Sequence, residues 1–398
     1  MRISDRIGQL EESATFAVTE KAARLKEQGV DVVSLTAGEP DFDTPEHIKD
    51  KAILAIKSGF TKYTASSGIA KLREAIARKL KRDNNLDYKP SDVLVSCGAK
   101  HSLYNIIQAI CNEGDEVIVP APYWTSYPEI IKASGAKAVM LQTHTSDGLK
   151  LTPNAIKKHI TNKTKAILLN SPSNPTGAVY YAKELEAIAE VLSDYDIFII
   201  SDEIYESIIY DGLRHISIAS INNKIKEKTI VINGVSKAYA MTGWRIGYAV
   251  GPKDVINVAA RLQSQSTSNP SSISQYAAVA ALDGEQSFIG KMVKEYENRR
   301  NYIINRIKSI SNISYIKPEG AFYFFIRIAD FFGRTLDGRT ISDSMSFSEC
   351  LLEHSNVATV AGVAFGADEY VRLSFSTSMD NIIKGLDRFE KFLKNIST

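Results

Sequence analysis

Side chains that could do chemistry follow short apolar segments of the chain. A small-residue turn at Gly98–Lys100 comes after one such segment and opens a helical pattern. A turn of this kind presents backbone N–H groups and the positive end of the helix dipole, which suits a phosphate or another anion. Trp124 follows the next segment, two residues after the stiff stretch Pro120–Pro122. At that position its ring could stack on a planar ligand.

Two further segments end in an amide and in a carboxylate. Asn174 lies in the turn 170–177, which two prolines and a terminal glycine shape strongly. Asp202 follows an apolar run, and Tyr205 comes three residues later. An aspartate at such a place often caps a helix. The alternative is a carboxylate that points into a ligand site.

A fifth segment ends at a lysine. Lys237 stands beside Ser236 and eight residues before Arg245, whereas an isolated lysine is usually solvated. Together the five segment ends offer an anion-binding turn, an aromatic ring, an amide, a carboxylate with a phenol, and an amine. This set suits pyridoxal phosphate, which needs a lysine for a Schiff base, a carboxylate at the ring nitrogen, a stacked ring and phosphate donors.

The elements that must position these side chains alternate between strands and helices. Helical periodicity is clear at Lys100–Cys111 and Ala182–Leu192. The predicted strands are Asp92–Ser96, Glu116–Val119, Lys137–Leu141, Lys165–Asn170, Ile197–Ser201, Thr229–Asn233 and Arg245–Val250. This alternation predicts an α/β fold, with a mainly parallel sheet covered by helices on both faces. Ligands bind such sheets at the carboxyl ends of the strands.

The pattern changes near residue 285. A long charged helix is predicted at Gln286–Ser309, and shorter strands mixed with helices follow it. We therefore expect a large domain over residues 46–285 and a smaller α+β domain over residues 286–398. Residues 1–45 are expected to form an N-terminal arm that joins the small domain. The composition of Gln263–Gln275, rich in Ser and Gln, is typical of a linker or surface loop.

Composition excludes several classes of protein. The 398 residues carry 48 Lys and Arg against 46 Asp and Glu, too balanced for a protein that coats nucleic acid or a membrane surface. Three dispersed cysteines and six dispersed histidines show no metal-ligand spacing, so no metal site is expected. The charged first residues leave no apolar signal-peptide core, and no 18-residue apolar run occurs. A cytoplasmic protein with reduced thiols is therefore expected.

Eight sequence segments together carry a family resemblance. They are SLTAGEPDFDTP (34–45), KYTASSGIAKLREA (62–75), PYWTSYP (122–128), NSPSNPTGAVY (170–180), SDEIYE (201–206), SKAYAMTGWRIGY (236–248), PEGAFY (318–323) and VRLSFSTS (371–378). The chain resembles class I pyridoxal-phosphate-dependent aminotransferases of fold type I, most closely the prokaryotic aspartate and aspartate/prephenate aminotransferases. The resemblance implies a seven-stranded, mainly parallel sheet.

The resemblance also implies roles around pyridoxal 5′-phosphate. Lys237 would form the Schiff base and later carry the proton, and Asp202 would pair with the ring nitrogen. Tyr205 and Asn174 would bond the ring 3′-oxygen, and Trp124 would stack on the ring. Lys237, Asp202 and Tyr205 are therefore the expected catalytic residues.

Phosphate contacts follow from the same resemblance. The donors would be the backbone N–H groups of Ala99 and Lys100 together with Ser236 and Arg245. Tyr63 matches a tyrosine that reaches the phosphate of the neighbouring subunit. This match implies a homodimer with shared active sites.

Substrate contacts are implied for Thr15, Gly38, Lys100, Trp124, Asn174 and Arg372. Arg372 would grip the α-carboxylate, for which a planar guanidinium is suited, and Gly38 would bring backbone close to it. Some relatives bind the distal carboxylate with an arginine that the partner subunit supplies from the stretch that matches Gln263–Gln275, and this stretch contains no arginine here. Lys100, assisted by Thr15, would take that role. On this basis Gln263–Gln275 becomes interface structure near the site.

The implied reaction is transamination between L-aspartate and 2-oxoglutarate, giving oxaloacetate and L-glutamate by a ping-pong mechanism. Relatives that also accept prephenate carry a basic residue near Glu11, where this chain has Glu11 and Glu12. A bifunctional aspartate/prephenate enzyme, an aromatic or alanine aminotransferase and a carbon–sulfur lyase remain alternatives. A ligand-sensing regulator is a further one, as is a catalytically silent relative, although every chemical position is filled.

Overall fold

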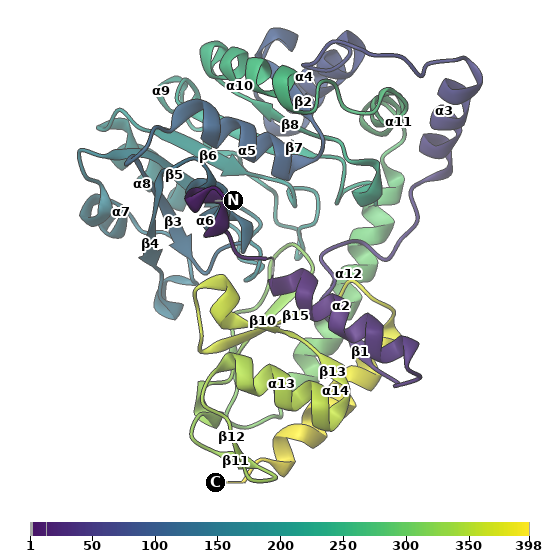
Figure 1. Cartoon of the computed structure of the whole chain (residues 1–398), viewed down its shortest axis with the longest axis vertical. Coiled ribbons are helices and arrows are strands. Elements are labelled where there is room, and N and C mark those ends of the chain that lie inside the picture. The colour runs from purple at the N-terminus through teal and green to yellow at the C-terminus, as the bar shows by residue number, and fades with distance from the viewer. Residues whose placement is uncertain (1–2, 13, 398) are drawn as a thin grey trace.

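The computed structural model describes residues 3–12 and 14–397. Its central feature is a seven-stranded sheet with strand order β2-β8-β7-β6-β5-β3-β4 (Figure 1). The strands are β2 (Val93–Ser96), β3 (Glu116–Ala121), β4 (Lys137–Gln142), β5 (Thr164–Asn170), β6 (Phe198–Asp202), β7 (Thr229–Gly234) and β8 (Gly247–Val250). Strand β8 runs antiparallel to both of its neighbours, β2 and β7, and the remaining pairs of this sheet are parallel. The predicted seven-stranded, mainly parallel sheet is therefore confirmed.

One predicted strand starts too early. Arg245–Val250 was expected as a strand, but β8 begins at Gly247. Arg245 has a φ of 57°, in the left-handed region, which no strand residue adopts. This conformation turns the chain just before the strand begins.

Helices cover both faces of the large sheet. They are α4 (Ala70–Asn84), α5 (Ala99–Ile110), α6 (Ser126–Ala133), α7 (Pro153–His159), α8 (Ala182–Ser193), α10 (Lys253–Ser266) and α11 (Ser272–Asp283). Further from the sheet, α3 (Glu46–Lys57) packs on α11, and the short helix α9 (Asn223–Lys226) packs on α8. Alternate residues of β5 divide between two cores: Leu168 packs with the cluster of α5, α6 and α10, and Ile167 packs with that of α7 and α8. Burial on both faces is why the strands are continuously apolar.

A second body of structure forms the lower part of Figure 1. Its antiparallel sheet has the order β14-β15-β10-β9. The strands are β9 (Ser314–Tyr315), β10 (Tyr323–Arg327), β14 (Val360–Ala361) and β15 (Tyr370–Ser374), with a hairpin of β11 (Thr335–Leu336) and β12 (Arg339–Thr340). The helices α12 (Ser287–Ile307), α13 (Ser344–Ser355) and α14 (Met379–Asn395) bury their apolar faces in one core with this sheet.

The N-terminal segment touches both parts. β1 (Val33–Ser34) pairs in parallel with β13 (Val357–Ala358) of the C-terminal part, and α2 (Ala14–Glu27) precedes it. The short helix α1 (Asp5–Gly8) instead lies against α6, where Arg6 Nη1 donates to the Ala133 carbonyl at 2.6 Å. The segment thus runs between the large sheet and the C-terminal part.

The prediction of a linker or surface loop from the composition of Gln263–Gln275 alone is wrong, in agreement with the family resemblance, which argues against a linker. The segment contains the end of α10 and the start of α11, and both terminal glutamines are buried. Gln263 Nε2 donates to the carbonyls of Ser66 and Val95, at 2.6 and 2.8 Å. Polar composition misled here because these side chains satisfy buried backbone groups instead of water.

Candidate active site

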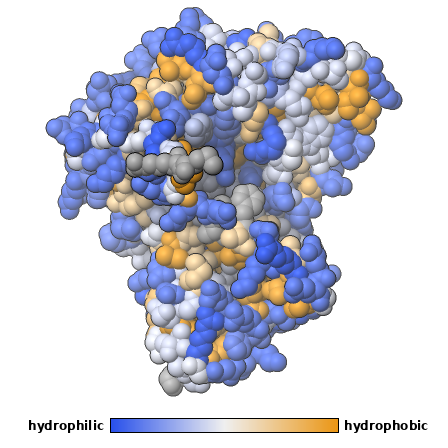
Figure 2. All heavy atoms as spheres, viewed as in Figure 1, coloured by the Kyte–Doolittle hydropathy of each residue, from blue (hydrophilic) through white to orange (hydrophobic). Residues whose placement is uncertain are grey.

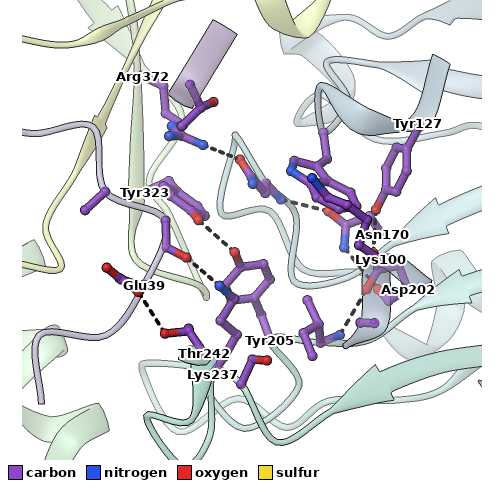
Figure 3. Close-up of a pocket in the computed structure, with 18 of the residues that line it drawn as sticks. Glu39, Lys100, Tyr127, Asn170, Asp202, Tyr205, Lys237, Thr242, Tyr323 and Arg372 are labelled. Carbon is purple, nitrogen blue, oxygen red and sulfur yellow. Dashed lines mark hydrogen bonds between the residues drawn. The ribbon is translucent and has the colours of Figure 1, made fainter. Parts of the chain in front are cut away.

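A cavity of 590 Å³ opens where the carboxyl ends of the large sheet face the C-terminal part. Its walls include every site residue expected from the sequence except Tyr63. Figure 3 shows side chains from both parts of the molecule converging on it. This volume is typical of a pocket for a cofactor with a small substrate.

Asp202 forms the floor of the cavity at the end of β6. The carboxylate is buried and accepts hydrogen bonds from Tyr127 Oη at 2.8 Å and from the Ile204 backbone N–H at 3.2 Å. Burial raises the pKa of Asp202 to about 6, although these two hydrogen bonds oppose the rise. A cation bound beside Asp202 would therefore stabilise the charged form of its carboxyl group.

Lys237 reaches the cavity from the loop that follows β7. Its ammonium donates to the Gly38 carbonyl, which belongs to the N-terminal segment (Figure 3). Burial lowers the pKa of Lys237 to about 8; Glu39 opposes this shift, and Arg245 and Arg372 add to it. An appreciable neutral fraction is therefore available near pH 7, as a nucleophilic or basic amine requires.

An anion cradle lies at one end of the cavity. Gly98 has a φ of 93° and precedes the first residue of α5, Ala99. A Cβ at Gly98 would clash with the guanidinium of Arg245, which donates to the Cys97 carbonyl at 3.3 Å. Only glycine permits both this backbone conformation and this approach. A helix N-terminus, an arginine and the hydroxyl of Ser236 thus meet at one place.

Arg372 enters from β15 with its guanidinium buried. It donates to Asn174 Oδ1 at 2.9 Å and to the Thr36 carbonyl at 2.8 Å. Its Nε is buried without a hydrogen-bond partner among the described residues. A buried guanidinium with an N–H group that has no acceptor is suited to bind a carboxylate.

Trp124 and Lys100 line another wall. The Lys100 ammonium lies 5.0 Å from the centre of the Trp124 ring. Burial, together with Arg245, lowers the pKa of Lys100. Thr15, in α2, lines the same cavity. Tyr63 is 92% exposed and lies outside the cavity, so it does not reach this site within its own chain.

Comparison with known proteins decides the family. A model of the family described as aminotransferase class I and II matches residues 30–389. The chain belongs to this family. It is 47% identical to the aspartate aminotransferase of Bacillus subtilis over 397 residues, covering 100% of both chains. It is 46% identical to the aspartate/prephenate aminotransferase of Nitrosomonas europaea over 396 residues, covering 99% of this chain and 100% of the relative.

Structural comparison agrees with the family assignment. The crystal structure of the aspartate aminotransferase from Rhizobium meliloti superposes with a TM-score of 0.96 at 42% identity, covering 100% of both chains. The predicted family and fold class are therefore confirmed, and fold type I describes this chain.

Aminotransferases of this family use pyridoxal 5′-phosphate, and the donor set of the cavity fits it. Asp202 offers a buried carboxylate for a ring nitrogen, and Lys237 offers an amine of lowered pKa. The cradle of Gly98 and Arg245 lies in the same cavity and offers an anion site. Each group that the cofactor requires is therefore present.

Several cavity residues were not singled out from the sequence. They are Thr19, Glu39, Tyr127, Asn170, Thr242 and Tyr323. Tyr127 lies in PYWTSYP one turn after Trp124, and Tyr323 closes PEGAFY, so both stood in recognised motifs without an assigned role. The bond from Thr242 Oγ1 to Glu39 Oε2, at 2.7 Å, is a tertiary contact that no local pattern encodes.

A cluster of acids and a histidine lies behind the cavity. Glu203, Glu206 and His215 bring one ligand atom each within 4.8 Å of the others. Lys79 pairs with Glu206, and His215 Nε2 lies 3.0 Å from Glu203 Oε2. Burial lowers the pKa of His215, but Glu203 and Glu206 together raise it, and the net shift is upward. The ammonium of Lys79 is therefore a cation in direct contact with this cluster of acids.

Proposed function

We propose that the protein catalyses transamination between L-aspartate and 2-oxoglutarate, giving oxaloacetate and L-glutamate by a ping-pong mechanism. One observation carries the proposal: the buried guanidinium of Arg372, with its unpartnered Nε, shares a cavity with Lys237 and Lys100. A site for an amino dicarboxylic acid needs two cations, one for each carboxylate, and a reactive amine between them. The names of the relatives support the same substrate.

The cofactor would be held by both ends. Ala99, Lys100, Ser236 and Arg245 would receive the phosphate, and Asp202 would pair with the ring nitrogen. Trp124 would stack on the ring, with Asn174 and Tyr205 at its 3′-oxygen. When bound, pyridoxal phosphate supplies an electron sink for the carbanion at the substrate Cα.

The chain's own groups then handle the proton and the charges. Lys237, with a pKa of about 8, would take the proton from the substrate Cα through its neutral amine. Asp202 in its charged form would keep the ring nitrogen protonated, and Tyr205 would donate to the ring oxygen. These three are the proposed catalytic residues.

Substrate recognition would divide between two cations. Arg372 and the backbone at Gly38 would receive the α-carboxylate, with Asn174 orienting the guanidinium through their 2.9 Å hydrogen bond. Lys100, assisted by Thr15, would bind the distal carboxylate, since both line the cavity. Trp124 would border the same space.

A homodimer with shared sites forms part of this proposal. Tyr63 is 92% exposed, which supports a role in the phosphate site of a second copy. Figure 2 shows hydrophobic residues gathered over α3, where Ile53, Leu54 and Ile56 are each about half exposed. Such a patch is typical of a protein interface.

Domain division and location complete the proposal. We assign residues 46–285 to a large domain, 286–398 to a small domain and 1–45 to an N-terminal arm, since α12 starts at Ser287. The described part of the chain contains no helix long and apolar enough to span a bilayer. A cytoplasmic location is supported by three free thiols, at Cys97, Cys111 and Cys350.

Prephenate is the second candidate substrate, because one relative is named for both activities. Glu11 argues against it: its backbone N–H donates to Glu129 Oε2 at 2.9 Å, so two carboxylates lie in the region where a basic residue would attract prephenate. Aromatic and alanine transamination would need no cation at Lys100. A substrate panel with 2-oxoglutarate as acceptor separates these candidates.

The proposal is tested by measuring glutamate formed from aspartate and 2-oxoglutarate. Lys237→Ala should abolish turnover while leaving thermal unfolding within a few degrees of the wild type. Lys100→Ala should raise KM at least about tenfold for aspartate and much less for phenylalanine, because only aspartate has a second carboxylate. No turnover of any amino acid by the wild type would reject the function. Equal losses for both substrates would reject the role of Lys100.

A further inference from the structure

A pair of buried phenols joins the two parts of the cavity. Tyr205 Oη and Tyr323 Oη lie 2.7 Å apart, and either can be the donor (Figure 3). Tyr205 belongs to the turn after β6, whereas Tyr323 is the first residue of β10. Their hydrogen bond therefore ties the edge of the large sheet to the C-terminal sheet.

Tyr323 also supports the carboxylate-binding arginine. The Arg372 Cζ lies 4.4 Å from the centre of the Tyr323 ring and 4.9 Å from that of Phe365. Tyr323 pairs in register with Ser374, two residues from Arg372, so the two side chains share a face of the sheet. Contact with two aromatic rings favours one orientation of the guanidinium.

Each phenol has a single proton to give. Burial raises the pKa of both hydroxyls, so both keep their protons near pH 7. If Tyr205 donated to Tyr323, it would have no proton for a ligand in the cavity. Tyr205 can donate into the cavity only when Tyr323 donates to Tyr205.

The charged groups that face the phenol pair come from three elements. They are Arg372 from β15, Asp202 from β6, and Lys237 from the loop after β7, whose ammonium lies 5.7 Å from the centre of the Tyr205 ring. Two of the three are cations when protonated. These two cations, Arg372 and protonated Lys237, draw electron density toward the phenol oxygens. They therefore polarise the hydrogen bond between the two phenols.

We propose that Tyr323 is a positioning residue for transamination: its hydroxyl fixes the direction of the Tyr205 proton, and its ring holds Arg372. This inference rests on the proposed function, in which Tyr205 donates to the 3′-oxygen of the cofactor. One side chain thus links carboxylate recognition to the hydrogen bond at the cofactor ring. Its two roles are separable, because one uses the hydroxyl and the other the ring.

Tyr323→Phe tests the hydroxyl alone. The readout is the pH midpoint of the visible absorption band of the bound cofactor. Donation from Tyr205 stabilises negative charge on the ring oxygen and so lowers this midpoint. Without Tyr323 to reinforce it, the midpoint should rise by about half a unit to one unit. The aromatic face remains, so KM for aspartate should change less than about twofold while kcat falls several-fold.

A double variant shows whether Tyr323 acts through Tyr205. Tyr323→Phe should shift the midpoint in the wild type and leave it unchanged in a Tyr205→Phe background. Tyr315→Phe is the matched control, because Tyr315 packs on Phe324 in the neighbouring strand and lies outside the cavity. Should Tyr323→Phe not fold, Tyr323→Met removes the same hydroxyl for the titration; because it also removes the ring beside Arg372, KM is not compared in that variant.

Two results would overturn the inference. One is a midpoint in Tyr323→Phe equal to that of the wild type and of Tyr315→Phe. The other is an equal shift in the Tyr205→Phe background, which would mean that Tyr323 acts without Tyr205. The wild type separates this inference from the proposed function: if aspartate leaves the wild-type spectrum unchanged, the function itself fails.

Discussion

Individual side chains of the site could be predicted where they follow strands, and not where they meet by tertiary contact. Lys237, Asp202 and Asn174 stand at strand ends, and the cavity brings them together as expected. The roles of Tyr127 and Tyr323 could not be predicted because each side chain contacts a residue that is distant in sequence. Tyr127 reaches Asp202 across 75 residues and Tyr323 reaches Tyr205 across 118, so no local pattern could assign their contacts.

The pH dependence of cofactor capture tests the Asp202 site. Because burial raises the pKa of Asp202 to about 6, its carboxyl gains a proton as the pH falls through about 6. A neutral carboxyl cannot pair with a protonated ring nitrogen, so the affinity of the apo-protein for pyridoxal phosphate should fall over that range. Fluorescence titration at a series of pH values measures it.

Tyr127→Phe sharpens this test. The Tyr127 hydroxyl lowers the pKa of Asp202, so its loss should move the midpoint of capture to higher pH. Tyr195→Phe, outside the cavity, is the control. A midpoint that does not move would show that Tyr127 leaves the charge of Asp202 unaffected.

Elements were predicted well where burial made strands continuously apolar, and poorly where polar residues are buried. The seven predicted strands all exist, with ends shifted by a residue or two. The composition of Gln263–Gln275 was a poor guide because it reports the polarity of the side chains and not the groups that they bond. The side chain of Gln275 accepts from the Ile69 N–H at 2.7 Å and donates to the Pro270 carbonyl at 2.9 Å. It therefore links α11 to the segment before α4 and to the turn before α11.

Gln263→Ala tests whether this segment is structural. Its side chain donates to two buried carbonyls and accepts from Asn105 Nδ2 at 2.9 Å, so removal leaves buried groups unsatisfied. We expect a loss of about 2–4 kcal/mol in the free energy of unfolding. Chemical denaturation measures it, with the exposed Gln265→Ala as control. A linker would give equal and small losses in both variants.

The whole molecule is arranged around the junction of its two parts. The large sheet supplies the lysine and aspartate, the C-terminal sheet supplies Arg372, and the N-terminal segment supplies Gly38. Net charge could not reveal this arrangement, since +2 over the whole chain hides four cations gathered in one cavity. How the parts face each other depends on contacts between distant residues, which a single sequence does not display.

Assembly is the prediction at this scale. Leu54→Glu places a charge on the half-exposed apolar surface of α3 and should weaken the proposed dimer. Sedimentation velocity should show a shift toward monomer, and the Kd for pyridoxal phosphate should rise because Tyr63 would be withdrawn from the partner's site. Met345→Glu, at an exposed apolar position on α13, is the matched control. A monomeric wild type would contradict the shared-site account.

The proposed function requires that one cavity binds an amino dicarboxylic acid and takes its amino group. In a single-turnover experiment, holo-protein is mixed with aspartate, glutamate, alanine or phenylalanine in the absence of any oxo acid, and the absorption spectrum of the cofactor is followed. We expect complete conversion to the pyridoxamine form with aspartate, which yields one equivalent of oxaloacetate, and with glutamate, which yields one equivalent of 2-oxoglutarate. Conversion with alanine and phenylalanine should be much slower. An unchanged spectrum with all four amino acids would contradict it.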